Sequence, residues 1–438
     1  MAQASEGESV TVQRRCFGNA EAVVAQWDFA VHGGTFGEAA AAAFESACAE
    51  AAATATPLVT VLRSGGTRLQ EGMRALVGIP RAAIALDRVA HAGVAHVSVA
   101  DHPTTGGVWV TIGAAADVRA AVAGATVGFS GPRVIQAMTG VTVPPGANTA
   151  QSAAAAGLVD AVIAPEGVDA WITQVLRTLR QDTPEPAVPA TSLSPSLAPP
   201  DRAGWAQVVH SRTSARADGA AVLAALLDDH VPLRGRDESV RAAVGRLRGR
   251  RVVMAAVAAT RAARVTPAGY RLLSRAARLA DRLAIPLVTL VDTAGADPLP
   301  DSEDDALAAE IGVALAAVLA CGAPTVSVVH GEGGSGGALA AAVTDLVAVT
   351  QDAWFAALAP EGAAATLRVT PQEAADLMRV APQDLLADGF ADAVVAADPE
   401  RLGRWVRAQL DLLGQLDPGV RRTKRGARWG GPLRPNVP

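Results

Sequence analysis

Residues 325–340 read TVSVVHGEGGSGGALA, an apolar run that ends in a glycine-rich turn and continues into small, helix-forming residues. Residues 96–108 read HVSVADHPTTGGV and follow the same course. A short strand that ends in a glycine turn and opens a helix leaves backbone N–H groups unpaired at the start of that helix. This unit occurs twice, and its repetition decides the fold that the sequence predicts.

Other segments repeat in the same order at nearly constant spacing, which indicates two copies of one domain. The pairs are PLVTV (57–61) with PLVTL (286–290) and HVSV (96–99) with TVSV (325–328), both 229 positions apart; Gly106-Gly107 with Gly336-Gly337, 230 apart; GPRVI with APEGA, 228 apart at Pro132 and Pro360; and GLVDAVIAP (157–165) with GFADAVVAA (389–397), 232 apart.

Within each copy, short Val-rich strands alternate with Ala-rich helical stretches, as in GYRLLSRAARLADRL before PLVTLVD. Near-continuous apolar strands that alternate with helices predict a parallel sheet covered by helices, so the fold class is α/β, twice. Six prolines at positions 184, 186, 189, 195, 199 and 200 predict an extended spacer between the copies. The expected organisation is a first domain at 8–180, a linker at 181–203, a second domain at 204–412 and a basic, flexible tail at 413–438.

Composition excludes several classes of protein. The chain has 438 residues, of which 50% are hydrophobic and 18% charged, so disorder is not expected. A net charge of -5 argues against a partner made of nucleic acid or an anionic membrane. Glycine and proline interrupt the most apolar segment, 311–329, and the N-terminus has no secretory pattern. Three scattered cysteines provide neither a disulfide framework nor a zinc site, so we expect a cytoplasmic protein.

The glycine turns are the strongest functional signal. Backbone N–H groups at the start of a helix, with the helix dipole behind them, suit a developing negative charge. Two such turns follow consecutive strands in each copy, and convergent amides of this kind form an oxyanion hole. The candidates are Gly66-Thr67, Gly106-Gly107, Gly295-Ala296 and Gly337-Ala338.

Three alternatives compete with an oxyanion hole. The glycines could serve only tight turns and close packing. Residues 331–336 fit G-x-G-x-x-G and could bind a dinucleotide, although no acidic residue follows at the usual distance. Ser64 precedes two glycines, but no paired histidine or G-x-S-x-G pattern supports a nucleophile.

The second half, with VDTAGADP, GEGGSGGALA, APEGAA and LLADGFADAVV, resembles the alpha subunit of bacterial acetyl-CoA carboxylase carboxyltransferase. The first half, with WDFAVHGGTFGE, SGGTRLQEGM, DHPTTGGV, GFSGPRVI and GLVDAVI, resembles the beta subunit. The resemblance covers about 8–180 and 203–412 and implies two tandem crotonase-like (ββα spiral) domains. It also implies transfer of a carboxyl group from N-carboxybiotin to a short acyl-CoA, with acetyl-CoA giving malonyl-CoA.

The resemblance assigns roles to the glycine turns. The enolate oxygen of the thioester is expected at the amides of Gly106 and Gly107, and the ureido oxygen of biotin at those of Gly337 and Ala338. Residues around these turns are expected to contact the substrates: Gly65, Gly66, Thr67, Arg68, Gly295, Ala296, Gly334, Ser335 and Gly336. Two oxyanions arise in the reaction, so two related holes suit it.

Expected partners are an acyl-CoA, a biotin carboxyl carrier protein, a biotin carboxylase and further copies of the chain. The sequence contains neither a biotin-attachment motif nor the four-cysteine ribbon of many beta subunits, so no zinc is expected. A biotin-independent decarboxylase of malonyl thioesters and a non-catalytic scaffold subunit are the alternatives.

Several other residues have open assignments. His102 and His330 lie at equivalent glycine turns of the two copies, where they could be proton-transfer groups or ordinary turn residues. Arg68 and Arg133 could bind phosphate or carboxylate, or form structural ion pairs. The tail carries six basic residues: Arg421, Arg422, Lys424, Arg425, Arg428 and Arg434. We expect them either to be solvated or to fold over the phosphates of CoA or an acidic partner.

Overall fold

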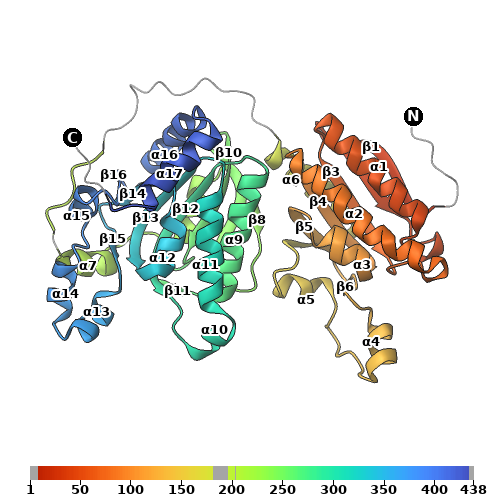
Figure 1. The fold of residues 1–438 in the computed structure, drawn as a ribbon, viewed down its shortest axis with the longest axis horizontal. Helices are drawn as coiled ribbons and strands as arrows, with labels where there is room; N and C mark the ends of the chain where they lie inside the picture. The colour runs from red at the N-terminus through yellow and green to blue at the C-terminus, as the bar shows by residue number, and fades with distance from the viewer. Residues whose placement is uncertain (1–7, 181–195, 203, 434–438) are drawn as a thin grey trace. The chain divides into compact units, whose positions relative to one another are not determined.

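The computed structural model describes residues 8–180, 196–202 and 204–433, and the chain divides into two compact units, Met1–Arg180 and Gln181–Pro438 (Figure 1). Most of the predicted linker, 181–195 and 203, lies outside the described residues. Its described end belongs to the second unit, because the Leu197 amide donates to the Val394 carbonyl at 2.8 Å.

A seven-stranded sheet forms the first unit. The order is β1-β2-β3-β4-β5-β7, with β6 beside β4; β1 and β2 are antiparallel and the other pairs are parallel. The strands are β1 (Val10–Phe17), β2 (Ala20–Trp27), β3 (Leu58–Ser64), β4 (His96–Thr105), β5 (Val118–Val122), β6 (Val127–Gly128) and β7 (Ala161–Ile163).

Helices of the first unit connect these strands. They are α1 (Glu38–Thr54), α2 (Met73–His91), α3 (Gly106–Val108), α4 (Pro132–Thr139), α5 (Ala150–Ala155) and α6 (Val168–Leu179), with short turns η1 (His32–Gly34), η2 (Leu69–Glu71) and η4 (Pro165–Gly167) and a π-helical turn η3 (Trp109–Gly113).

A nine-stranded sheet forms the second unit, in the order β16-β14-β13-β12-β10-β9-β8, with β11 beside β12 and β15 beside β13. The strands are β8 (Asp229–Leu233), β9 (Val240–Leu247), β10 (Arg250–Val257), β11 (Ala263–Val265), β12 (Leu287–Ala296), β13 (Thr325–Gly334), β14 (Leu346–Thr350), β15 (Trp354–Ala356) and β16 (Ala393–Val395).

The second unit has more helices than the first among the described residues. They are α7 (Gly204–Thr213), α8 (Gly219–Leu226), α9 (Pro267–Arg282), α10 (Pro300–Asp304), α11 (Leu307–Ala320), α12 (Ser335–Ala342), α13 (Pro360–Leu367), α14 (Pro371–Leu377), α15 (Pro382–Ala387), α16 (Pro399–Gly414) and α17 (Pro418–Trp429).

The two sheets repeat one topology, since β1-β2-β3-β4-β5-β7 corresponds in order and direction to β9-β10-β12-β13-β14-β16. Their central strands are rich in Val, Leu and Ala and are buried. In the first unit, the ring of Phe44 from α1 packs together with those of Trp27 and Phe36, with centroids 5.8 to 6.5 Å apart. The α/β duplication predicted from the sequence is present.

The predicted alignment of the glycine turns is wrong by one residue. Strand pairing equates Ser64–Thr104 with Thr293–Gly333, at an offset of 229 throughout. Gly106, with φ 69°, therefore corresponds to Ser335, with φ 68°, and not to Gly336. The serine adopts a left-handed conformation that normally favours glycine, which hides the correspondence in the sequence.

The basic stretch after residue 413 is not a flexible tail where the structure describes it. Helix α16 continues to Gly414, and α17 begins at Pro418, with the Asp417 side chain capping its first turn. The fully buried Arg425 side chain pairs with Asp345, at 2.8 and 2.9 Å. Arg425 also donates to the Leu319 and Cys321 carbonyls at the end of α11, so this basic residue holds the unit together.

Replacing Arg425 should therefore destabilise the second unit. Arg425→Ala leaves the Asp345 carboxylate buried without its cation, and we expect a loss of about 3–5 kcal/mol in the free energy of unfolding. Lys424→Ala, on the exposed side of the same helix, is the control. Urea unfolding curves test this, and equal midpoints for the two variants would contradict the role given to Arg425.

Candidate active site

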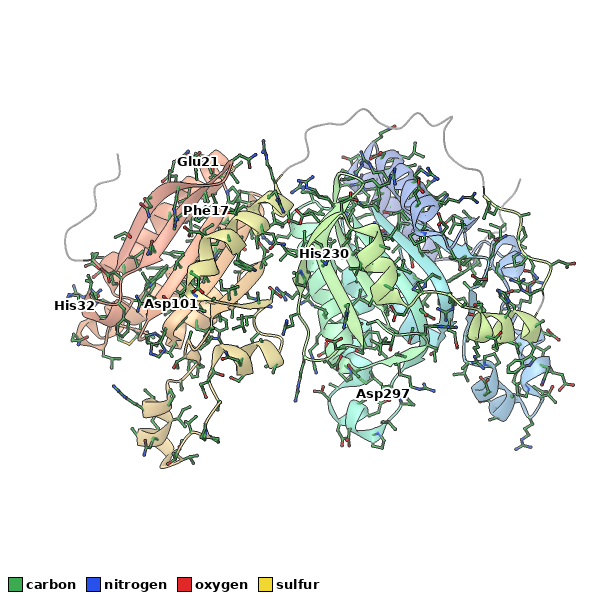
Figure 2. The ribbon with its side chains drawn as sticks, turned by 180° about the vertical axis from the view of Figure 1, so that it is seen from behind. Phe17, Glu21, His32, Asp101, His230 and Asp297 are labelled. Atoms are coloured by element: carbon green, nitrogen blue, oxygen red, sulfur yellow. The ribbon has the colours of Figure 1, made fainter. Side chains whose placement is uncertain are left out.

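Both units gather their glycine turns at the carboxyl ends of two neighbouring parallel strands. In the first unit these strands are β3 and β4, and in the second β12 and β13. Figure 2 shows Asp101 of β4 far from Phe17 and Glu21 of the β1–β2 hairpin, and Asp297, just after β12, far from His230. Ligands of parallel α/β sheets bind at this end of the strands.

The two turns of the first unit meet through their backbones. A Cβ atom at Gly106 would lie 3.0 Å from the Cα of Gly66, and both glycines have positive φ. No other residue fits this approach without moving the backbone. A Cβ atom at Gly107 would lie 2.6 Å from the Ile79 side chain.

Most amides of these turns already have acceptors inside the protein. Gly65 donates to the Gly33 carbonyl, and Gly66 donates to Oγ of Ser64 at 3.1 Å. Gly106 donates to the Phe129 carbonyl at 2.8 Å. Gly107 lies in the first turn of α3, where an amide has no intrahelical acceptor. Ser64 is thus a turn-forming residue, and Gly107 is the amide of this turn that remains suited to a ligand.

Other predicted residues of the first unit have structural roles. Arg68 is 7% exposed and pairs with Glu71 at 3.0 Å and Glu8 at 3.4 Å, so its charge is neutralised inside the fold. The neighbouring Thr67 forms a backbone bridge with Phe36. His102 is exposed, and its Nδ1 accepts from the Thr126 amide at 3.2 Å. Arg68 therefore has partners inside the fold, and its expected substrate contact stays a prediction. Arg133 is exposed on α4.

The second unit repeats this construction. Gly295, with φ 123°, donates to Oγ1 of Thr293 at 3.0 Å, as Gly66 does to Ser64. A Cβ atom at Gly295 would lie 3.1 Å from the Gly334 carbonyl oxygen, and one at Gly334 would collide with the Ala294 carbonyl. Ser335 then opens α12, whose eight residues carry Gly336, Gly337 and Ala338 in the first turn.

Gly337, in the first turn of α12, is also tightly packed. A Cβ atom there would collide with the Tyr270 hydroxyl and lie 2.7 Å from the Ala296 nitrogen. Ala338 is fully buried beside it. The first turn of α12 and the backbone at the end of β12 are therefore in contact. An oxyanion hole requires two turns to approach each other in this way.

Buried charges support the ends of β12 and β13. Arg216 forms a bidentate pair with Asp292, and both side chains are almost inaccessible. The Asp292 Oδ1 atom also accepts from the Glu332 amide at 2.9 Å, which joins the two strands where their register shifts. Glu332 is 3% exposed and pairs with Arg212 at 3.2 Å. Burial raises the pKa of Glu332, and Arg212 opposes that rise.

His330 lies among these charges and does not line a turn. Its side chain is buried, its Nε2 atom has no hydrogen-bond partner, and burial lowers its pKa to about 4. Its counterpart in the first unit at the offset of 229 is Asp101, so the predicted equivalence with His102 is wrong. A neutral imidazole at this position is part of the core.

The dinucleotide alternative fails on geometry. Gly331, Gly333 and Gly334 belong to strand β13 itself, and a Cβ atom at Gly331 would collide with Asp292 and Arg216. A dinucleotide fingerprint needs its glycines in the turn between strand and helix, where the pyrophosphate binds. Here Gly331 leaves space for the buried side chains of Asp292 and Arg216 instead.

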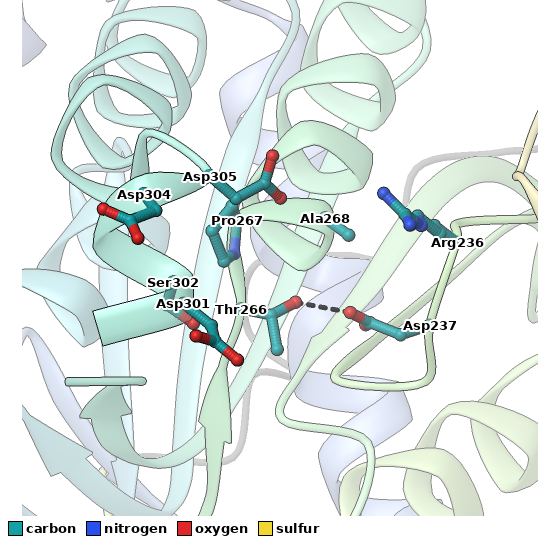
Figure 3. Close-up of a pocket in the computed structure, with 9 residues that line it drawn as sticks. All are labelled: Arg236, Asp237, Thr266, Pro267, Ala268, Asp301, Ser302, Asp304 and Asp305. Carbon is teal, nitrogen blue, oxygen red and sulfur yellow. Dashed lines mark hydrogen bonds between the residues drawn. The ribbon is translucent and has the colours of Figure 1, made fainter. Parts of the chain in front are cut away.

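An open acidic hollow of about 620 Å³ lies beside the second turn (Figure 3). It contains one arginine and four aspartates: Arg236, Asp237, Asp301, Asp304 and Asp305. Two lining residues connect this hollow to the end of β12. Thr266 follows Val265, which pairs with Ala296. Ser302 donates to Asp297 at 2.6 Å. The charge of this hollow disfavours phosphate groups.

In the ranges that the structure describes, no three His, Cys, Asp or Glu side chains are grouped to hold a metal ion. Every helix in those ranges is too short or too polar to span a bilayer.

Comparison with known proteins identifies the family. Residues 201–411 match the family described as acetyl co-enzyme A carboxylase carboxyltransferase-like. The chain is 33% identical, over 462 residues, to the "acetyl-coenzyme A carboxylase carboxyl transferase subunits beta/alpha" of Saccharopolyspora erythraea, covering 98% of this chain and 81% of the relative. This chain belongs to the carboxyltransferase family of biotin-dependent acyl-CoA carboxylases.

Further relatives agree with this family. The carboxyltransferase is 34% identical to a "probable biotin-dependent acyl-coenzyme A carboxylase beta3 subunit" of Mycobacterium tuberculosis, over 98% of this chain and 90% of that one. A transcarboxylase 12S structure with hydrolysed methylmalonyl-CoA bound superposes with a TM-score of 0.76, over 93% of this chain and 81% of that one, at 22% identity. That likeness establishes the crotonase-like fold of both units.

A relative of this chain is named as a biotin-dependent carboxylase subunit, and the donors at the second turn suit the ureido group of biotin. The evidence for the fit lies in this chain. Gly337 lies in the first turn of α12, whose backbone amides are free of intrahelical acceptors, and it has no room for a methyl group. The nearby Tyr270 hydroxyl has no hydrogen-bond partner. These groups are hydrogen-bond donors, and a ureido oxygen is an acceptor.

Sequence reasoning missed Tyr270, Asp292 and Glu332. It also missed Arg212 and Arg216, which pair with the two acidic residues. A usable signal was present, because Asp292 interrupts the apolar run LVTLVD and Glu332 interrupts VVHGEGG. Charged residues inside otherwise apolar strands are rarely buried unless they are paired. Their partners Arg212 and Arg216 come from α7 and the segment after it, which no local pattern could connect to the strands.

The depressed pKa of His330 predicts a pH-dependent stability. An unfolded chain takes up this proton near pH 6.5, whereas the native state resists it until about pH 4. The stability is therefore complete above pH 6.5 and falls as the pH decreases towards 4, by up to about 1.4 kcal/mol per pH unit.

His330→Gln should flatten this dependence, and urea midpoints at pH 7 and pH 5 measure it. The exposed His91→Gln is the matched control. An equal loss of stability between pH 7 and pH 5 in the parent and in His330→Gln would contradict the assignment.

Proposed function

We propose that the protein transfers a carboxyl group from N-carboxybiotin on a carrier protein to the α-carbon of a short acyl-CoA, with acetyl-CoA as acceptor and malonyl-CoA as product. The duplicated glycine turn carries this proposal, since each unit brings two strand ends into backbone contact beside a helix start. Acetyl-CoA is favoured because relatives with this domain order are named for it.

The first turn receives the thioester in this proposal. After the carboxyl group leaves N-carboxybiotin, the ureido group carries the negative charge and takes up the α-proton of the acyl-CoA. Charge then develops on the thioester oxygen, which faces the amides at Gly106-Gly107, and the α-carbon takes up the carboxyl group. Gly107 is the principal donor, because the Gly106 amide already donates to Phe129. Gly106 contributes the space that a Cβ atom would fill, and Gly65, Gly66 and Thr67 shape the turn.

The second turn receives the biotin ureido group, which supplies the carboxyl group. Amides at Gly337 and Ala338 hold its oxygen, and Gly295, Ala296, Gly334, Ser335 and Gly336 shape the turn. The acidic hollow beside Ala296 supports this division of labour. Its aspartates would repel the phosphates of CoA and would tolerate the neutral biotin arm.

The proposal requires partner proteins that carry and carboxylate biotin. It also includes self-association, because α2, α4 and their flanking segments expose large apolar side chains that a monomer rarely leaves in water. These are Leu69, Met73, Phe129, Val134 and Met138. The free cysteines Cys16, Cys48 and Cys321 are consistent with a reducing, cytoplasmic location.

The reverse reaction tests the function directly. The purified protein is incubated with malonyl-CoA and biotinylated carrier, and the release of acetyl-CoA is followed with and without the carrier. We expect release that depends on biotin. Release that does not need biotin would support a decarboxylase, and propionyl-CoA as a much better acceptor in the forward direction would contradict acetyl-CoA.

Gly337→Ala tests the second turn. The added methyl group meets Tyr270 and Ala296, so it should distort the turn and lower the transfer rate at least about 100-fold. The matched control is Gly312→Ala in α11, where a methyl group meets nothing within 4 Å. Transfer at the parent rate by a folded Gly337→Ala protein would exclude this turn from the site.

Gly107→Val tests the turn of the first unit. Its side chain would crowd Ile79 and cover the helix start, so we expect a similar loss of transfer. The control is Gly167→Ala, where no atom lies within 4 Å. Unchanged transfer would move the thioester oxygen away from Gly107.

A further inference from the structure

We propose that the hydroxyl group of Tyr270 is a hydrogen-bond donor to the carbonyl oxygen that binds at the Gly337 turn. This inference rests on the proposed function and adds to the turn a side-chain donor from α9. In the biotin-dependent reaction, the acceptor would be the ureido oxygen, which gains negative charge when the carboxyl group leaves.

The position of Tyr270 supports a role at this turn. Its ring is fully buried on α9, and its hydroxyl oxygen occupies the space against Gly337 that a methyl group would need. The Ala296 nitrogen borders the same space, at 2.7 Å from the Cβ position of Gly337. The hydroxyl therefore lies where the end of β12 meets the first turn of α12.

The hydroxyl has no hydrogen-bond partner in the protein. A buried hydroxyl without a partner destabilises a fold, and such groups in native structures require an explanation. Phenylalanine would fill the same volume without that penalty. A bound carbonyl oxygen would be the acceptor that this group lacks, and burial raises the pKa of the Tyr270 phenol, so the donor proton is retained throughout the neutral range.

The helix start alone would be weak evidence, because many helices expose amides at their N-termini. Here the unpartnered hydroxyl is a second, independent observation on the same turn. Both kinds of group are donors. Together they favour a ligand that presents an acceptor oxygen and disfavour a cationic or purely apolar ligand.

Tyr270→Phe separates this role from packing. We expect the melting temperature to stay equal to that of the parent or to rise, because the substitution removes an unsatisfied group. In the malonyl-CoA assay with biotinylated carrier, we expect kcat to fall roughly 10- to 100-fold, as for the loss of one hydrogen bond to a charged group. The KM for malonyl-CoA should not change, because that substrate is assigned to the first turn.

Ser274→Ala is the matched control. Its hydroxyl is also buried without a partner and lies one helical turn along α9, and it is not among the atoms nearest to the Cβ position of Gly337. We expect parent-like kcat from this variant. An equal fall in kcat in both variants would show a general effect of α9 packing and overturn the inference.

Two further results distinguish the inference from the function on which it rests. If Tyr270→Phe transfers within twofold of a parent that is itself active with biotin, the hydroxyl has no ligand and the inference fails, while the function stands. If the parent shows no biotin-dependent transfer, the proposed function fails and the inference fails with it. A fall in both melting temperature and kcat of Tyr270→Phe would assign the hydroxyl to folding.

Discussion

Contact between two backbone turns at the ends of neighbouring parallel strands is the constraint on which this structure depends. Gly66 meets Gly106 in the first unit, and Gly295 meets Gly334 in the second, at distances that leave no room for a side chain. The alternation of strand and helix places these turns at one edge of each sheet, and the core of Val, Leu and Ala fixes the strands behind them. A packed interior of this kind resists small displacements, which is what an oxyanion hole needs.

The two units hold this arrangement with different side chains. At the position where the second unit has Asp292, paired with Arg216, the first unit has Arg63, which pairs with the half-buried Asp101 at 3.3 Å. The sign of the charge at this position is therefore opposite in the two copies, and the pair of the second unit is far more deeply buried. Arg425 adds another buried cation at the back of the second unit. Breaking the Arg216–Asp292 pair would leave an uncompensated buried charge at the ends of β12 and β13.

Much of the fold could be predicted from the sequence because its signals are local. Strand composition, glycine turns and the constant offset between copies all survive in the printed order of residues. Position 335 could not be aligned correctly, since a serine there adopts the conformation of Gly106. The helical tail was also missed, because the sequence shows the charges of Arg425 and Arg428 but not the acidic partners, Asp345 and Asp392, which lie far away in the chain.

The candidate site was predictable as a set of turns and less so as individual donors. Only the structure shows that the amides of Gly65, Gly66 and Gly106 already have acceptors, and that Arg68 is neutralised by glutamates. Tyr270 lies 67 positions before Gly337, and no spacing rule connects them. Such contacts arise from tertiary packing, which a single sequence does not display.

A crystal structure of the protein with malonyl-CoA and a biotin-bearing carrier domain would test the central claim most directly. We expect the thioester oxygen within about 2.7–3.2 Å of the Gly107 nitrogen, and the ureido oxygen at the same range from the nitrogen of Gly337 or Ala338. Ligand oxygens bound by side chains elsewhere, with both glycine turns empty, would contradict it.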